Sequence, residues 1–260
     1  MELSVLGIPV CGDLIEKWKS FWCFPVQPFP VQDLPPKLLA QLPTSRDITP
    51  SDEFRDTFYL YDANDWRYYA QEDLASLPGY LHNELLRIQK RSYPEEIFPA
   101  WPDDPFLVPK MIRWIERGVR PSLHRLAAQS LEAASQRRLP AVKSLAGTFA
   151  GSSGANCFQT VMLAAGENPS DPWVTQDVFA EFLTRRAEPI SGSHADNTAG
   201  VIFTWTLNGD LAHAAVTIGD GWCVVKPSQS WSSPRVVWTV PEVVASWRFK
   251  GTKMQRWLLS

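Results

Sequence analysis

Hydrophobic residues recur at helical spacing in several stretches of the first half of the chain. Apolar side chains three and four positions apart predict one helix over about 80–92 and another over about 105–117. A longer helix is predicted from Pro121, which suits a first turn, to Arg138, which stands just before a Leu-Pro pair. Three helices are therefore expected between residues 80 and 138.

In the second half, helical patterns come first and strand patterns follow. A helix is predicted over 157–165, and another from Thr175 as N-cap to Arg186. Five strands are predicted after these helices, over about 200–206, 212–218, 222–227, 235–239 and 254–259. A helical turn is predicted near 241–247, before the last strand. Helices followed by antiparallel strands predict an α+β fold with a helical layer on a sheet.

The first half is rich in proline and in aromatic residues. Residues 1–109 contain 14 of the 22 prolines, so this part is expected to be irregular, with short elements. Disorder is not expected, because many large apolar side chains need burial. They are Trp18, Phe21, Trp22, Phe24, Phe54, Phe58, Tyr59, Tyr61, Trp66, Tyr68 and Tyr69, and we expect them to pack on a partner or on the second half.

We place the domain boundary between residues 140 and 148. The chain then divides into a Pro- and aromatic-rich, irregular or helical N-terminal domain, residues 1–145, and a C-terminal domain, residues 146–260. The sequence gives the N-terminal domain no role, and a protein partner bound through it stays open.

Composition and charge describe an ordinary globular protein with 45% hydrophobic and 20% charged residues. The formal net charge of −3 argues against binding to nucleic acid or to an anionic membrane. No apolar run approaches the roughly 20 residues of a membrane span. The start of the chain lacks the features of a signal peptide, so a cytoplasmic location is expected, with non-classical export left open.

The four cysteines stand at positions 11, 23, 157 and 223, too few and too scattered for a disulfide scaffold. Neither a CxxC nor an HExxH motif is present, so we expect no metal site and no cofactor.

Cys157 occupies the most informative position of the four. It follows the Gly/Ser loop Gly151-Ser152-Ser153-Gly154-Ala155-Asn156 and begins an apolar helix. A thiol at a helix start lies beside unpaired backbone N–H groups and the positive end of the helix dipole, which stabilise a thiolate. Cys157 is therefore a candidate nucleophile, against the alternative that it packs as a small buried hydrophobe.

A nucleophilic thiol needs a base, and His213 is the candidate. It stands near the start of the strand Leu211–Ile218, which turns through Gly219-Asp220-Gly221 and returns as Trp222–Lys226. The alternative is a structural histidine hydrogen-bonded at the end of a sheet. His82, His124 and His194 have no partner pattern.

These residues resemble the catalytic motifs of papain-like cysteine peptidases. Gly154-Ala155-Asn156-Cys157-Phe158 is similar to the head of their nucleophile helix, and His213 through Gln229-Ser230-Trp231 is similar to their His strand and the following Asn-Ser-Trp. His213 follows Cys157 by 56 residues, a short separation that resembles the compact NlpC-type cell-wall endopeptidases and amidases. The resemblance covers residues 148–260 and implies a nucleophile helix packed on an antiparallel sheet.

The third catalytic residue departs from the pattern of that family. The NlpC-type position falls on apolar Val225, which leaves Gln229 or Ser228 to orient the imidazole. The oxyanion glutamine of papain falls near Gly151, so the oxyanion hole is expected from the Cys157 N–H with Asn156 or Ser153 as a neighbouring donor.

Other residues near these motifs have structural interpretations. Cys223 is expected in the core, Asp210 in a turn, Lys226 at a solvated strand position and Gln159 on a helix surface.

The sequence therefore predicts a thiol-dependent hydrolase that cleaves an amide bond through Cys157, His213 and Gln229. The resemblance implies a peptide or muropeptide-like substrate, with a cytoplasmic amide or a secreted-effector role still open. Two alternatives remain: an acyltransferase or deamidase with the same Cys-His chemistry, and an inactive papain-fold binding module.

Overall fold

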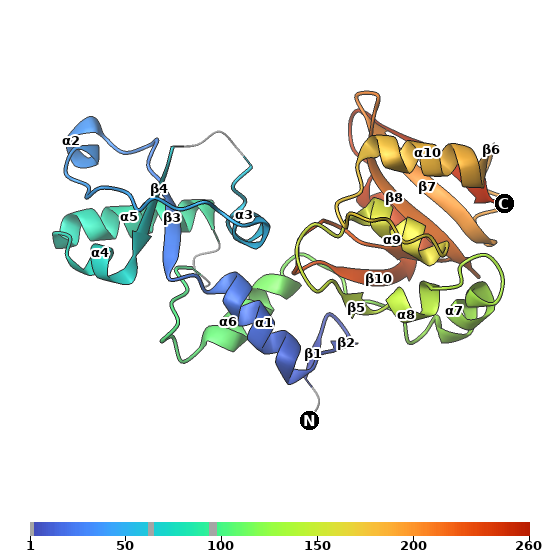
Figure 1. Cartoon of the computed structure of the whole chain (residues 1–260), viewed down its shortest axis with the longest axis horizontal. Helices are drawn as coiled ribbons and strands as arrows, with labels where there is room; N and C mark the ends of the chain where they lie inside the picture. Colours follow the sequence, from blue (N-terminus) through green and yellow to red (C-terminus); the bar gives the residue numbers. More distant parts are fainter. Residues whose placement is uncertain (1–2, 62–64, 94–97) are drawn as a thin grey trace. The chain divides into compact units, whose positions relative to one another are not determined.

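A computed structural model describes residues 3–61, 65–93 and 98–260, and the chain divides into two compact units. The N-terminal unit comprises Val10–Val119 with Leu3, and the C-terminal unit comprises Arg120–Ser260 with Ser4–Pro9. Each unit combines helices with antiparallel strands, so the chain is a mixed α/β protein (Figure 1). Among the described residues, none of the helices combines the length and the apolar character needed to cross a membrane.

The division corrects the boundary expected near residue 145. The segment that follows Arg120 packs into the same core as the large sheet, since Leu131, Leu139 and Val142 belong to that hydrophobic cluster. Hydrophobic burial therefore assigns this segment to the C-terminal unit.

The N-terminal unit consists of short elements, as the prolines predict. These are α1 (Gly12–Trp22), β3 (Val26–Pro30), α2 (Pro36–Leu39), α3 (Asp52–Phe58), β4 (Trp66–Ala70), α4 (Gln71–Ala75), α5 (Gly79–Ser92) and α6 (Leu107–Glu116). Strands β3 and β4 form an antiparallel ribbon. Pro28 and Pro30 are two positions apart in β3, so their nitrogen atoms point to the same edge of the strand. Proline has no backbone N–H, and its absence at both positions limits pairing of a further strand at that edge.

The aromatic residues of the N-terminal unit pack against one another. Phe54 contacts Phe24 with ring centroids 4.7 Å apart and Phe58 at 4.8 Å, and Trp18 and Trp22 are fully buried. A second cluster joins the β3–β4 ribbon to α5 through Phe29, Val31, Leu34, Tyr69, Leu74, Leu85 and Ile88. Most of these aromatic side chains therefore supply a core within this unit, where the sequence left a partner or the second half as the site of burial. The expectation is wrong for Tyr59 and Tyr61, which are 65% and 52% exposed.

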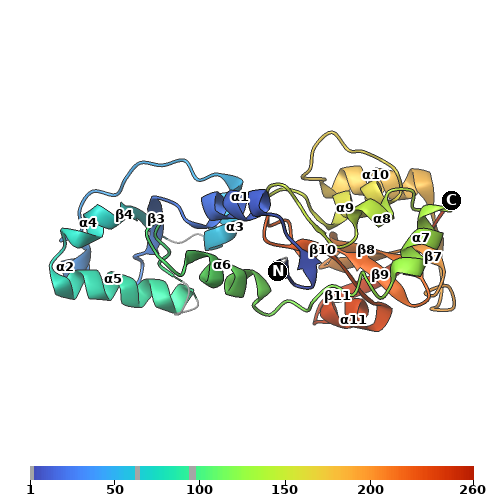
Figure 2. The same ribbon diagram turned by 90° about the horizontal axis from the view of Figure 1, so that it is seen from below.

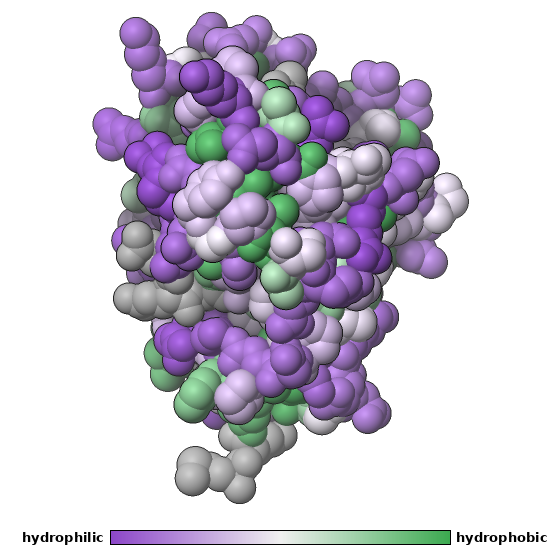
Figure 3. All heavy atoms as spheres, turned by 90° about the vertical axis from the view of Figure 1, so that its left-hand side faces the viewer, coloured by the Kyte–Doolittle hydropathy of each residue, from purple (hydrophilic) through white to green (hydrophobic). Residues whose placement is uncertain are grey.

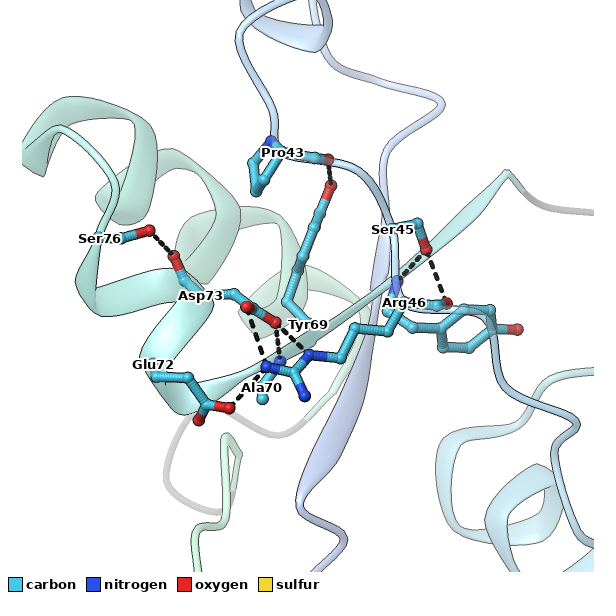
Figure 4. A network of polar contacts seen from close by, with 9 residues as sticks. Pro43, Ser45, Arg46, Tyr69, Ala70, Glu72, Asp73 and Ser76 are labelled. Carbon is cyan, nitrogen blue, oxygen red and sulfur yellow. Dashed lines mark hydrogen bonds and ion pairs between the residues drawn. The ribbon is translucent and has the colours of Figure 1, made fainter.

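A polar network fixes the segment that approaches β4 and α4 (Figure 4). The Arg46 guanidinium donates to Asp73 at 2.6 Å and to Glu72 at 2.5 Å, and the Tyr69 hydroxyl donates to the Pro43 carbonyl at 3.1 Å. Figure 3 looks onto the N-terminal unit from the end that carries α2 and α5, and hydrophilic residues cover most of this face. The small core of this unit thus lies beneath a polar surface.

The C-terminal unit is built on one antiparallel sheet. Its helices are α7 (Ala128–Ser135), α8 (Val142–Leu145), α9 (Cys157–Ala164), α10 (Gln176–Arg186) and α11 (Val240–Ser246). Its strands are β1 (Ser4–Val5), β2 (Ile8–Pro9), β5 (Thr148–Phe149), β6 (Ala187–Ile190), β7 (Ala199–Leu207), β8 (Asp210–Gly219), β9 (Trp222–Val225), β10 (Pro234–Thr239) and β11 (Thr252–Leu259). In the described part of the chain, seven of them pair in the order β5-β10-β9-β8-β7-β11-β6, and β1 pairs with β2.

The two faces of this sheet have different partners. Helices α9 and α10 lie on one face, and α11 lies on the other (Figure 2). The α9 face holds the main core, in which Phe158 stacks on Phe179 of α10 with ring centroids 4.5 Å apart. Ala214, Val216 and Ile218 of β8 belong to this core. Because side chains alternate along a strand, the residues between them face the α11 side.

Most of the predicted elements of this unit are confirmed, including the hairpin between β8 and β9. Gly219, Asp220 and Gly221 all have positive φ, between 52° and 93°. Glycine adopts this conformation without strain, and aspartate is among the residues that tolerate it best, so the turn follows from the sequence.

The helix predicted from Pro121 to Arg138 is wrong at its ends, because α7 covers only Ala128–Ser135. The preceding segment pairs with β10 instead: the Leu123 N–H donates to the Val237 carbonyl at 2.8 Å, and the Val237 N–H donates to the Ser122 hydroxyl at 3.1 Å. A tertiary contact thus takes up backbone groups that a helix would have used.

Candidate active site

A pocket of about 530 Å³ lies in the C-terminal unit, at the start of two helices and one strand. Its wall consists of Trp247 and residues 156–158, 173–177, 211–213 and 226–229. The first of these segments begins α9, the second begins α10 and the third belongs to the start of β8. Two helix N-termini, each the positive end of a helix dipole, therefore border the same pocket.

Cys157 is the first residue of α9 and lies on the wall of this pocket with 8% of its surface exposed. Burial raises the pKa of its thiol to about 11. The backbone N–H groups of Ala214, Phe158 and Cys157 itself act in the opposite direction and lower this pKa, as does the positive charge of Lys226. The thiol is therefore protonated at neutral pH, while the groups around it favour negative charge as it forms.

Asn156 caps α9. Its side-chain oxygen accepts from the Gln159 N–H at 2.9 Å, and its side-chain nitrogen donates to the Val174 carbonyl at 2.7 Å. The side chain thus fixes the start of the helix and ties it to the segment that leads into α10. The structure places Asn156 on the pocket wall, as the oxyanion assignment requires, but with its amide engaged in these two contacts.

His213 also lines the pocket, and its ring lies on the α11 side of β8, opposite α9. The imidazole stacks on the indole of Trp247, with ring centroids 4.2 Å apart and planes 10° apart, and contacts Trp205 at 5.6 Å. Within the described residues, its buried Nε2 has no hydrogen-bond partner. Burial lowers the pKa of His213 to about 3, so the ring is neutral at neutral pH.

A bulge at the start of β8 positions this histidine. His213 pairs with Trp205, but Leu211 pairs with the next residue, Thr206, so Ala212 is the additional residue. Leu211 packs against the core under α9, whereas the ring of His213 does not. The sulfur of Cys157 and the imidazole thus approach one pocket from opposite faces of β8.

The expected orienting residues lie in the turn after β9. Ser228 and Gln229 both line the pocket, Ser228 exposed and Gln229 half-buried. The Gln229 carbonyl accepts from the Gly154 N–H at 3.1 Å, which joins this turn to the loop before Cys157. Ser153 lies in that loop, outside the pocket wall, and its hydroxyl accepts from the Trp231 N–H at 3.3 Å.

Two residues near the site are buried where the sequence predicted solvent-exposed positions. Lys226 lies on the pocket wall and is fully buried, and Gln159 is 9% exposed and accepts from Arg235 at 3.4 Å. The sequence did contain a signal for Lys226, because it continues the apolar strand directly after Val224-Val225. The aromatic support from Trp247 had no such signal, since it depends on α11 folding against the sheet.

Within the described residues, no group of three or more His, Cys, Asp or Glu side chains is arranged to hold a metal ion. Comparisons with models of protein families, with curated proteins and with solved structures find no match for the chain. The function is therefore argued from the pocket itself.

Proposed function

We propose that this pocket is the active site of a thiol-dependent hydrolase that cleaves an amide or peptide bond. The single observation that carries the proposal is the position of the Cys157 thiol. It lies in the first turn of α9, beside three backbone N–H groups, on the wall of a pocket that His213 also lines. The resemblance of residues 148–260 to NlpC-type papain-like enzymes adds the substrate class, a peptide or a peptidoglycan stem peptide.

In the proposed reaction the Cys157 sulfur attacks the carbonyl carbon of the amide, and the thiol proton passes to His213 through water in the pocket that both side chains line. Backbone N–H groups at the start of α9 stabilise the charge that develops on the carbonyl oxygen. The imidazolium then protonates the departing amine, which leaves a thioester on Cys157. Water, deprotonated by His213, attacks the thioester and releases the acid and the free thiol.

The charge state of the pair determines when the proton moves. Because the pKa of the thiol is raised to about 11 and that of the imidazole is lowered to about 3, both groups are neutral before substrate binds. Proton transfer is therefore expected during attack on the carbonyl, and no resting thiolate–imidazolium pair is expected.

A second candidate function is a binding pocket without catalysis. It is favoured by the stacked ring of His213, whose Nε2 has no hydrogen-bond partner among the described residues. A catalytic imidazole is normally oriented by such a partner. The exposed indole of Trp173 on the pocket wall would serve either function by contacting an apolar group of the ligand.

Two measurements on the full chain test the proposal. The first is acylation by p-nitrophenyl acetate with mass mapping of the acylated residue, and the second is turnover of a panel of peptide amides and muropeptides. We expect a transient acetyl group on Cys157, which Cys157→Ala abolishes. Cys11→Ser, which removes an exposed thiol, is the control and should retain the acetyl group. We expect His213→Phe, which keeps an aromatic ring beside Trp247, to slow turnover by about 100-fold or more. Binding of peptides or muropeptides without acylation of Cys157 would establish the second candidate instead.

A further inference from the structure

Lys226 is a fully buried lysine in the first position after β9. Its ammonium group donates to the carbonyl of Ser228 at 2.6 Å and to the carbonyl of Ser230 at 2.9 Å. Lysine is rarely fully buried, because removing an ammonium group from water costs several kcal/mol unless its charge is compensated. Turns are usually stabilised by short polar side chains such as Asn, Asp or Ser. The turn alone therefore does not explain why a lysine is buried at this position.

The turn that Lys226 closes also supports the loop before the nucleophile. Gln229 lies between the two carbonyls that Lys226 binds, and its own carbonyl accepts from Gly154. Trp231, directly after them, donates to Ser153. The lysine thus connects the end of β9, through this turn, to the loop that leads into Cys157.

Lys226 lies on the wall of the same pocket as Cys157. The other titratable side chains on that wall, within the described residues, are Asp177 at the start of α10 and His213 on β8. Asp177 carries negative charge and is exposed, and His213 is neutral because burial lowers its pKa. Lys226 is accordingly the cation of the pocket, and its charge acts on the sulfur in the direction that favours a thiolate.

We infer that Lys226 is a positioning residue of the Cys157 site, which holds the 227–231 turn and places a buried positive charge on the pocket wall that Cys157 shares. The inference rests on the proposed function only in taking Cys157 as the nucleophile. The charge compensates the negative charge that develops on the thiol as its proton leaves. It acts between two buried side chains, where such an interaction is stronger than at a surface.

The test is the pH dependence of Cys157 alkylation by iodoacetamide, measured by mass mapping in the full chain. Lys226→Met removes the charge, Lys226→Gln removes the charge but keeps a hydrogen-bond donor, and Lys226→Arg keeps both. Lys253→Met, on an exposed position of β11, is the matched control. Circular dichroism and thermal melting establish which variants fold, and Lys226→Gln carries the test where Lys226→Met does not fold.

We expect Lys226→Met and Lys226→Gln to lower the alkylation rate at pH 8 by about tenfold. This corresponds to a rise of about one unit in the pH at which the alkylation rate is half its maximum. Lys226→Arg is expected to stay within about threefold of the wild type, and Lys253→Met to be unchanged. Because the charge is buried, added salt should not reproduce the effect. A folded neutral variant whose alkylation profile superimposes on that of the wild type would overturn the inference.

Alkylation also separates this inference from the proposed function. A tenfold effect of Lys226→Gln on alkylation, in a protein without amide turnover, supports the inference and contradicts the hydrolase. Cys157-dependent turnover together with an unchanged alkylation profile in Lys226→Gln contradicts the inference and leaves the hydrolase standing.

Discussion

The imidazole of His213 lies flat on the indole of Trp247, with ring centroids 4.2 Å apart and planes 10° apart. This contact, with Trp205 at the side, encloses the ring in apolar surface, and no carboxylate of the described residues compensates a charge on it. The stack therefore holds the ring in place and keeps it neutral. A neutral ring is the form that accepts a proton, but a ring with a pKa of about 3 is a weak base at neutral pH, which favours the second candidate function.

The first prediction concerns the stability of the protein at low pH. The pKa of His213 is lowered from its ordinary value of 6.5 to about 3 in the folded chain, so below pH 6.5 the unfolded chain binds a proton that the folded chain does not. The contribution of His213 to stability is thus complete above about pH 6.5 and is lost as the pH falls toward 3. The expected loss is at most about 1.4 kcal/mol per pH unit.

Denaturant unfolding of the wild type and of His213→Phe at a series of pH values measures this contribution. The difference in unfolding free energy between the two proteins should change steadily between pH 6.5 and 3 and stay constant above pH 7. A constant difference across the whole range would show that the ring of His213 protonates as readily in the folded chain as in the unfolded one.

The second prediction concerns the reactivity of Cys157. Because burial raises the pKa of its thiol to about 11, alkylation by iodoacetamide should rise about tenfold for each pH unit from 8 to 10, without a plateau near neutrality. His213→Phe should leave this profile unchanged. A neutral plateau that disappears in His213→Phe would instead indicate a resting thiolate–imidazolium pair.

The third prediction concerns the cap of α9. Asn156→Ala removes the acceptor for the Gln159 N–H and the donor to the Val174 carbonyl, and should lower the unfolding free energy by about 1–2 kcal/mol. Asn156→Asp keeps the capping oxygen and loses only the donor, so it should recover part of this loss. Thermal or denaturant unfolding of the three proteins measures both effects, and equal stability of the two variants would contradict the capping role.

The fourth prediction concerns Trp247 itself. Trp247→Ala opens the stacked face of His213 to water, so the pKa of the imidazole should rise toward its ordinary value. Trp247→Phe keeps an aromatic face and should give a smaller rise. Titration of the imidazole by NMR measures the change, and an unchanged pKa in Trp247→Ala would mean that other groups keep the ring from water.

Local sequence patterns were sufficient for much of the C-terminal unit. The Gly-Asp-Gly turn requires positive φ, which places the β8–β9 hairpin, and the polar residue before an apolar run places the start of α9 at Cys157. The presence of Cys157, His213 and Gln229 around one pocket agrees with the order of elements that the sequence predicts. The hairpin and the helix start depend on residues close together in the chain, so their signals are local, whereas Cys157, His213 and Gln229 are far apart in the chain and meet only in the fold.

The sequence by itself determined most elements of the C-terminal unit, because turns, caps and periodicity act over a few residues. Only the tertiary structure decided that residues 120–123 contact β10 and that His213 stacks on Trp247 across β8 from α9. Each of these depends on surfaces from distant parts of the chain meeting in the fold. Contacts between distant segments arise from that meeting, and no local pattern specifies them.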